Sequence, residues 1–199
     1  MTVENSARGE RTREDIVTAA HQLFLEQGFH GTSMRQIAHK AHIAVGGIYN
    51  HFSSKEEIFL AVLLHFHPFF DLLPAMNAAQ GETVDEFVRD AARRIVGELG
   101  EGMEFLNLLF IELVEFKGRH VPQVFELIFP QVMEFAHRFL EGKDKLRPIP
   151  RPIIVRAFIG LFFSYVMTEM IIGKQLPPEM RENSLDHFVD IYLYGILDQ

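Results

Sequence analysis

The sequence predicts an all-α protein that consists of a small N-terminal unit of three helices and a larger C-terminal helical body. Apolar residues recur along the chain with the 3.6-residue period of an amphipathic helix, and no segment alternates convincingly with the period of two that marks a β-strand. Glycines, prolines and capping residues divide the periodic segments into lengths typical of helices. With 48% hydrophobic and 23% charged residues among its 199, the chain has the composition of a well-cored globular protein.

Three periodic segments make up the N-terminal unit. The first ends at Gln27-Gly28, and its apolar face is formed by Ile16, Ala19, Ala20, Leu23 and Phe24. In the second, Ser33 and Gln36 have the spacing of a capping box, in which each side chain bonds the backbone N–H of the other residue. Its apolar positions are Met34, Ile37, Ala38 and Ala41. After a short turn at Ile43, residues 44–52 are expected to form the third helix.

The body is expected to contain a series of longer helices. Two overlapping capping boxes, Ser53 with Glu56 and Ser54 with Glu57, start a helix that reaches Phe69. A rigid proline-rich linker lies at residues 148–152. Further helices are expected at residues 83–97, 103–117, 122–142, 153–172 and 178–197. The predicted domains are residues 8–55 and residues 56–199.

Composition excludes several classes of protein. The chain has no cysteine, so it has no disulfide, no thiolate metal site and no cysteine nucleophile. Its first fifteen residues are polar and charged, so no secretory signal is expected and the cytoplasm is the expected location.

Charge is distributed unevenly along the chain, whose formal net charge is −8. Residues 1–55 carry six Lys/Arg and five acids, whereas residues 56–199 carry thirteen Lys/Arg and twenty-two acids. Five of the ten histidines also lie in the first segment. Phosphate groups could therefore approach the N-terminal unit but not the acidic body. The alternative is a chance asymmetry in a two-part protein.

The second and third segments have the spacing of a helix-turn-helix, whose second helix enters the major groove of DNA. Flanking residues match, in order and spacing, the pattern of one family: Gly28, Thr32-Ser33, Ile37-Ala38, Tyr49-Asn50-His51-Phe52 and Ser54-Lys55-Glu56-Glu57. Over roughly residues 11–62 the chain thus resembles the TetR family of transcriptional regulators. The resemblance implies a DNA-binding protein that is not an enzyme.

The resemblance implies that phosphates are contacted by Thr32 or Ser33, Tyr49, His51 and Lys55. Lys55 lies in the first turn of a helix, where backbone N–H groups and the helix dipole favour an anion. The expected base-reading surface is Val45, Gly46, Gly47, Tyr49 and Asn50, with Arg35 beside it. Two alternatives remain: Tyr49 and His51 could form the rim of the small core, and Lys55 could be an ordinary surface lysine.

The chain departs from the family pattern in its turn and third helix. His42 stands where a glycine is usual and Ala44 where a serine is usual, while Val45 and Gly47 replace a lysine and a threonine. Each glycine costs a helix about 1 kcal/mol relative to alanine. The third helix is therefore expected to be weakly preformed and to discriminate modestly between sequences.

The body is expected to hold a small, largely apolar inducer, as the resemblance implies. Pro68, Pro74 and Pro130 interrupt helical segments, and kinked helices leave space for pockets. The expected lining is His65, His67, Phe70, Asn107, Glu112, Phe129, Met133 and Phe162. The alternative is that these side chains simply form the helical core.

No metal, cofactor or catalytic centre is expected. His39 with His42, and His67 with Asp71, are spaced to share a helix face, but neither pair has an evident third ligand. Neither a Gly-x-Ser-x-Gly motif nor a phosphate-binding glycine loop occurs in the chain. A membrane span is also rejected at residues 153–172, because Arg156 and Glu169 bound an uncharged run shorter than the roughly 20 residues that spanning needs.

The last two helices are expected to form a four-helix homodimer interface, as the family implies. Its predicted residues are Ala157, Gly160, Ser164, Leu185, Phe188, Val189 and Tyr192. A twofold dimer would bind a palindromic double-stranded DNA operator. Burial of both helices within one subunit is the alternative.

Together these expectations describe a dimeric transcriptional regulator, a repressor that a small apolar ligand releases from DNA. Two other interpretations stay open. One is a ligand-binding or carrier-like helical protein with a degenerate DNA head, and the other is an activator or nucleoid-associated protein.

Overall fold

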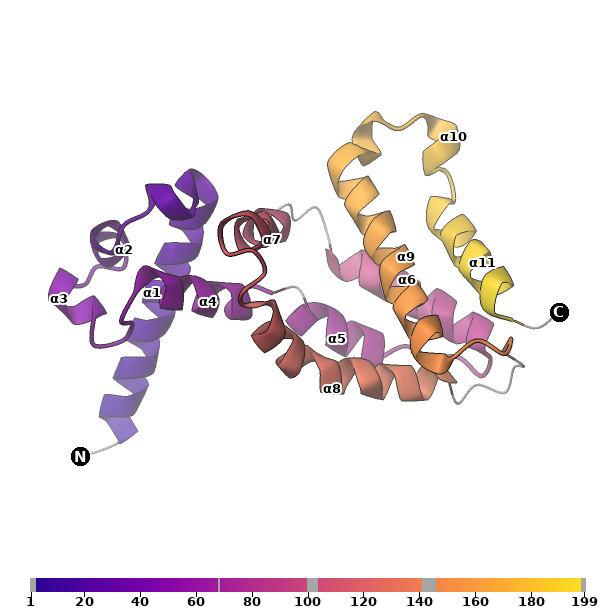
Figure 1. Ribbon diagram of the computed structural model, residues 1–199, viewed down its shortest axis with the longest axis horizontal. Helices are drawn as coiled ribbons and strands as arrows, with labels where there is room; N and C mark the ends of the chain where they lie inside the picture. The colour runs from indigo at the N-terminus through magenta and orange to yellow at the C-terminus, as the bar shows by residue number, and fades with distance from the viewer. Residues whose placement is uncertain (1–2, 68, 100–103, 141–145, 198–199) are drawn as a thin grey trace. The chain divides into compact units, whose positions relative to one another are not determined.

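A computed structural model describes residues 3–67, 69–99, 104–140 and 146–197 (Figure 1). Within these ranges the chain is helical, and its β-structure is limited to an isolated bridge between Leu146 and Leu197. The predicted all-α class is confirmed. The α-helices are α1 Val3–Gly31, α2 Met34–Lys40, α3 Val45–Ile48, α4 Lys55–His65, α5 Phe69–Asn77, α6 Val84–Leu99, α7 Glu104–Glu115, α8 Val121–Leu140, α9 Arg151–Ile172, α10 Pro178–Arg181 and α11 Ser184–Ile196.

The helices form two compact units. The first contains α1–α4, α7 and the beginning of α8 as far as Glu126, and the second contains α5, α6, the rest of α8 and α9–α11. By packing, α4 and α7 therefore belong with the predicted helix-turn-helix segment. The predicted functional division between residues 8–55 and 56–199 stays a prediction.

In the first unit, α1 packs against α2, α4 and α7. The face predicted for α1 is buried, as expected from its periodicity. Gly28 (φ +74°) interrupts the helical conformation after Gln27, which is the predicted end of the main helix. The core of the unit includes Ile16, Ala20, Phe24, Ile37, Ala38, Ile48, Phe52, Ile58, Phe59 and Val62.

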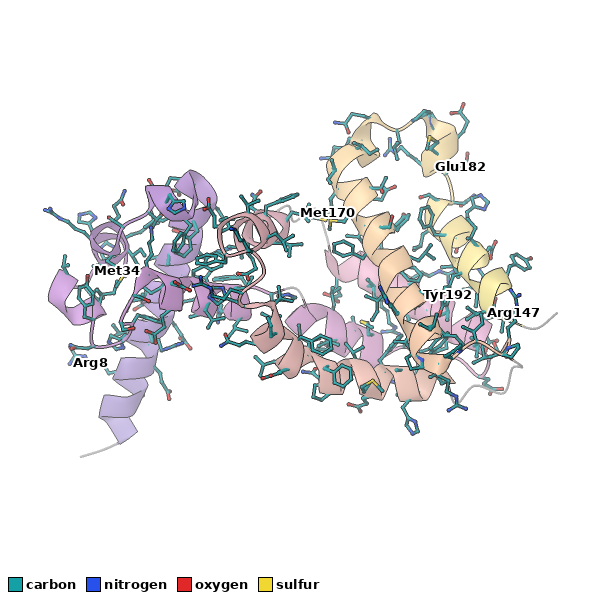
Figure 2. All side chains as sticks on the ribbon, viewed as in Figure 1. Arg8, Met34, Arg147, Met170, Glu182 and Tyr192 are labelled. Atoms are coloured by element: carbon teal, nitrogen blue, oxygen red, sulfur yellow. The ribbon has the colours of Figure 1, made fainter. Side chains whose placement is uncertain are left out.

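In the second unit, α6 packs against α5, α9 and α11. Its core is a cluster of aromatic rings formed by Phe87, Phe135, Phe139, Phe158 and Tyr192. Tyr192, labelled in Figure 2, donates a hydrogen bond from α11 to the Ile154 carbonyl oxygen of α9 at 3.0 Å. Burial raises the pKa of its phenol. Arg89 of α6 adds an ion pair to Asp190 of α11 (2.5 Å).

Three predicted helices differ from the observed ones. The third helix was predicted too long: regular α-helix covers Val45–Ile48, and hydrogen bonds at i→i−3 spacing continue the turn to His51. The helix that starts at Lys55 ends at His65, and α5 follows as a separate helix. The segment after Pro177 forms α10 and α11 instead of one helix, because Asn183 adopts a left-handed conformation (φ +54°) between them.

Candidate nucleic-acid interface

The helix-turn-helix is formed by α2, the turn Ala41–Ala44 and α3. His42 lies in the middle of the turn with a positive φ of +56°, and its backbone N–H donates to the His39 carbonyl oxygen (3.1 Å). The next N–H, of Ile43, donates to the Ala38 carbonyl oxygen (2.9 Å). A positive φ costs a non-glycine residue roughly 1–2 kcal/mol. This cost explains in physical terms why glycine is the usual residue at this position.

The predicted capping box at the start of α2 is confirmed. Ser33 Oγ accepts a hydrogen bond from the Gln36 backbone N–H (3.3 Å), and Gln36 Oε1 accepts one from the Ser33 backbone N–H (2.8 Å). Ser33 is exposed, so its hydroxyl group stands at the surface where a phosphate could bind.

Thr32 differs from the expectation that its side chain touches DNA. It is only 2% exposed, and its hydroxyl group lies within hydrogen-bond distance of the carbonyl oxygens of Leu23 (3.2 Å) and Gly28 (2.9 Å). The one donor hydrogen of this hydroxyl is directed to carbonyl oxygens near the end of the main α1 helix, so the group is turned away from solvent. Of the pair Thr32 and Ser33, only Ser33 is exposed; in this conformation its hydroxyl donates to Gln36 Oε1 (2.7 Å), and a bond to phosphate would replace that contact.

Lys55 is not an ordinary surface lysine. Its Nζ donates hydrogen bonds to the carbonyl oxygens of Phe29 (2.5 Å) and Thr32 (2.6 Å), and it lies 4.1 Å from the centroid of the Phe29 ring. Burial lowers the pKa of this ammonium group. Two of its three N–H groups are thus used to close the end of α1. The third N–H group takes part in neither of these bonds, and its contact with a phosphate stays a prediction.

The start of α4 differs in part from the prediction. Ser54 caps the helix, accepting a hydrogen bond from the Glu57 N–H (3.1 Å), while the Glu57 carboxylate accepts from the Ser53 backbone N–H (2.7 Å) and hydroxyl (2.8 Å). These bonds to Ser53 lower the pKa of Glu57. The predicted pairing of Ser53 with Glu56 does not form, because Glu56 instead binds Arg119 (2.6 Å).

The predicted base-reading surface is exposed. Val45, Gly46, Tyr49 and Asn50 are accessible to solvent, with Tyr49 55% exposed, while Ile48 holds α3 to the core. Gly47 and His51 are half-buried. A Cβ atom added at Gly46 or Gly47 would have no neighbour within 4 Å. The two glycines are therefore not required by packing.

The structure adds basic residues that the sequence prediction did not assign to this surface. Arg35 shares an open groove of about 560 Å³ with His39, Lys40 and His42. Lys40 also pairs with Glu26 (3.2 Å). Separately, the Arg13 guanidinium stacks on the Phe52 ring at 4.6 Å, next to His51 along the chain. Arg35, His39 and Lys40 lie on α2 and His42 in the turn that follows it, whereas the contacts of Lys40 with Glu26 and of Arg13 with Phe52 join segments distant in sequence, so no sequence pattern indicated those two contacts.

The predicted ligand residues do not converge in the way expected. In the first unit His65 and Asn107 are exposed, while His67 and Glu112 are buried; in the second, Phe129 and Met133 are exposed and Phe162 is buried. The side chain of Phe70 lies outside the described residues. Burial lowers the pKa of His67 to about 4.

Glu112 already has a hydrogen-bond partner within the protein. Its carboxylate, 1% exposed, accepts hydrogen bonds from the His120 backbone N–H and from His120 Nδ1, both at 2.8 Å. These bonds hold Glu112 in a buried pair with His120, and its predicted contact with a ligand stays a prediction. Among the described residues, no three His, Asp or Glu side chains are grouped so as to hold a metal ion.

The predicted dimer residues divide by helix face. Ala157, Gly160 and Ser164 are exposed on α9, and Leu185 and Phe188 of α11 are half-buried. Val189 and Tyr192, however, are 1% and 5% exposed and pack inside their own unit. The prediction for these two was wrong because it placed the apolar stripe of α11 against a partner. The outward face of α11 carries Ile191 and Tyr194 instead, 65% and 69% exposed.

The α9 helix with the turn that follows it, residues 151–175, is the one described segment long and apolar enough to cross a membrane, with a mean hydropathy of 1.6. A third of its most apolar stretch is buried. A single such helix is weak evidence for a membrane span, because the core helix of a soluble protein has the same length and composition.

Comparison with known proteins agrees with this architecture. The family model described as bacterial regulatory proteins, tetR family, matches residues 16–62. The HTH-type transcriptional regulator SrpR of Pseudomonas putida is 40% identical over 144 residues; these are 71% of this chain but only 62% of SrpR, less than two thirds of its length. The HTH-type transcriptional regulator TtgW, also of Pseudomonas putida, is 38% identical over 144 residues, which are 98% of that protein.

The fold is shared with solved structures as well. A TetR-family regulator from Mesorhizobium loti, 21% identical, superposes with a TM-score of 0.71 over 96% of this chain and 99% of that one. The combination of a helix-turn-helix with a helical body is thus found over the whole length of a known structure. The chain belongs to the TetR family of DNA-binding transcriptional regulators, which are not enzymes.

Proposed function

We propose that the protein is a homodimeric repressor that binds a palindromic operator and is released from it by a small, largely apolar inducer. The observation that carries the DNA-binding part is one surface of the first unit, where Ser33, Tyr49 and Asn50 are exposed around the short helix α3. Such a regulator works in the cytoplasm, where its operator is accessible.

The proposed phosphate contacts come from Ser33, Tyr49, His51 and Lys55. Hydroxyl, imidazole and ammonium groups are all hydrogen-bond donors to phosphate oxygens. Arg13 adds a cation that is already held against Phe52. These contacts would set the position of the protein on the duplex but carry no sequence information.

Sequence discrimination is proposed to be modest. Asn50 suits adenine and Arg35 suits guanine through paired hydrogen bonds, each worth about 1–3 kcal/mol of discrimination. Val45 and the two glycines present no hydrogen-bonding side chain, so they can offer only contact with thymine methyl groups and close backbone approach. A regular helix of four residues, Val45–Ile48, agrees with this limited reading surface.

The proposed dimer interface is the outward face of α9 and α11. On α9 the small residues Ala157, Gly160 and Ser164 are exposed beside Phe163, which allows close approach of a partner helix with an apolar contact at its edge. On α11 the exposed residues Ile191 and Tyr194 supply the corresponding apolar face. Exposed apolar side chains that gather in a patch mark protein interfaces. A twofold arrangement would place two recognition helices on the two half-sites of a palindrome.

The inducer site is proposed for the body, with Phe129 and Met133 as two of its contacts. They are spaced i, i+4 on α8 and are about half exposed, so they present one apolar face of the helix. The repressor direction is the simplest mechanism, because a dimer bound to an operator blocks transcription without any contact to the polymerase, whereas an activator needs such a contact.

The decisive experiment is selection of a random duplex library with the purified protein, followed by binding measurements at several salt concentrations. Enrichment of a palindrome, with affinity that falls as salt rises, supports the proposal. Enrichment of no sequence would overturn it in favour of a carrier-like protein if DNA binding is also absent, or of a nucleoid-associated protein if binding persists. A reporter gene behind the selected operator then separates repression from activation.

A further inference from the structure

Phe116 lies in the turn between α7 and α8 and reaches into the core of the DNA-binding unit. Its ring meets Phe29 edge-on, with centroids 4.7 Å apart at 73°, and stacks on Phe59 of α4 at 4.7 Å and 22°. Both arrangements are favourable aromatic geometries. Phe116 is itself buried, so it contacts neither solvent nor DNA.

Phe29 connects this ring to the predicted phosphate contact. The Lys55 Nζ lies 4.1 Å from the centroid of the Phe29 ring and 2.5 Å from the Phe29 carbonyl oxygen. Ring and carbonyl belong to one residue, so a shift of Phe29 moves both partners of the ammonium group together. The remaining hydrogen bond of the ammonium group is to the carbonyl oxygen of Thr32, the residue directly before Ser33, which caps α2.

The turn that carries Phe116 is firmly attached to the same unit. The buried pair of Glu112 and His120 closes the turn through two hydrogen bonds of 2.8 Å. From the turn, Arg119 binds Glu56 at 2.6 Å, and His120 Nε2 lies 3.6 Å from the same carboxylate. Glu56 follows Lys55 directly in the chain. The turn therefore holds the first residues of α4 from one side through charge and the end of α1 from the other through Phe116.

We propose that Phe116 is a positioning residue for DNA binding, which acts through Phe29 to hold the Lys55 ammonium where it can meet a phosphate. The proposal rests on the proposed function of the α2–α3 surface. Residues 112–120 would then control operator affinity without touching DNA, and a movement of this turn would alter affinity for all sequences alike.

A double-mutant cycle tests the coupling. Operator affinity is measured by fluorescence anisotropy for the wild type, Phe116→Leu, Lys55→Met and the double variant. A displaced cation–π and phosphate contact predicts a loss of about tenfold for Phe116→Leu. Because both changes act through one ammonium group, the double variant should bind no more weakly than Lys55→Met alone. Losses that multiply, or wild-type affinity for Phe116→Leu, would overturn the proposal.

Controls separate positioning from folding. Phe110→Leu, at an exposed phenylalanine on the neighbouring helix α7, should leave operator affinity unchanged within about twofold, since exposed substitutions have small effects. Helical content and the urea midpoint are measured for every variant. If Phe116→Leu is partly unfolded under the binding conditions, Phe116→Met, which refills the space without a ring, takes its place in the cycle.

A second readout needs no DNA. Lys55 is tied to two carbonyl oxygens, so its acylation by acetic anhydride should be slow compared with that of the exposed Lys174. Mass spectrometry should show faster acylation of Lys55 in Phe116→Leu, with Lys174 unchanged. An unchanged Lys55 rate would contradict the positioning role. If library selection enriches no operator, the proposed function fails, while this labelling still decides whether Phe116 holds Lys55.

Discussion

Tyr192 of α11 donates its phenolic hydrogen to the Ile154 carbonyl oxygen of α9 at 3.0 Å, and this bond helps to hold one face of α11 against its own unit. The hydrogen bond and the aromatic contact with Phe158 turn Tyr192 and Val189 inward. Ile191 and Tyr194 are consequently directed to solvent. The orientation of α11 thus places Val189 and Tyr192 in the core of their own unit and leaves Ile191 and Tyr194 for the proposed dimer interface.

If the protein forms the proposed dimer, substitution of Ile191 by glutamate should yield a folded monomer, because a charge would be placed in the proposed apolar interface. Sedimentation velocity measures the oligomeric state. Tyr192→Phe is the matched control: it should lower the free energy of unfolding by about 1 kcal/mol through loss of its hydrogen bond and leave the dimer intact. A dimeric Ile191→Glu protein would show that the interface lies elsewhere.

Lys55→Met should weaken binding to operator and random DNA alike, by about tenfold, because a phosphate contact carries no base information. The slope of log affinity against log salt should become shallower by about 1. Lys174→Met, a change to an exposed lysine in the second unit, should leave both quantities unchanged. A loss confined to the operator would instead assign Lys55 to base reading.

Gly46→Ala and Gly47→Ala should each raise the free energy of unfolding by up to about 1 kcal/mol, since alanine has the higher helix propensity. The structure offers no obstacle, because no atom lies within 4 Å of either added Cβ. Urea titration measures the change. The contrasting variant is Gly28→Ala, which should destabilise the protein because Gly28 has a φ of +74°. If Gly46→Ala and Gly47→Ala both destabilise the protein, the two glycines are needed for the fold.

His42→Gly should stabilise the helix-turn-helix by about 1 kcal/mol, because glycine adopts the positive φ of this turn without steric cost. The gain is reduced by the greater flexibility of glycine in the unfolded chain. Asparagine also tolerates this conformation, so the stability of His42→Asn should lie between those of the wild type and His42→Gly. Thermal unfolding compares the three proteins, and a lower midpoint for His42→Gly would show that the imidazole makes a compensating contact.

Stability should fall between pH 7 and pH 5 because the fold holds His67 neutral. Burial lowers its pKa to about 4, whereas the unfolded chain protonates it near 6.5. The stability contribution is thus complete above about pH 6.5 and decreases as pH falls toward 4, amounting to about 2 kcal/mol between pH 7 and pH 5. The pKa of His21 is also lowered, by burial, and adds in the same direction.

Chemical unfolding at both pH values measures this effect. His67→Gln should remove much of the difference between pH 7 and pH 5, whereas His187→Gln, at an exposed position, should retain it. An unchanged pH dependence in His67→Gln would mean that another group is responsible.

Local chemistry made much of the DNA-binding unit predictable. The capping box of Ser33 and Gln36, the cap at Ser54 and the end of the main helix at Gly28 depend on residues within a few positions of one another. The burial of the α1 face follows from periodicity alone. Helix lengths were less predictable where α3 ends at Ile48 and where Asn183 takes a left-handed conformation.

The family motifs in the sequence by themselves determined that this chain is an all-α regulator with a helix-turn-helix. Only the tertiary structure decided that Thr32 faces inward, that Lys55 is bound to the end of α1, that Glu112 belongs to His120 and that α11 turns Ile191 outward. The physical reason is the range of the interactions. Caps and periodic faces are set by neighbours in the chain, whereas the direction of a side chain is set by packing between helices that are distant in sequence.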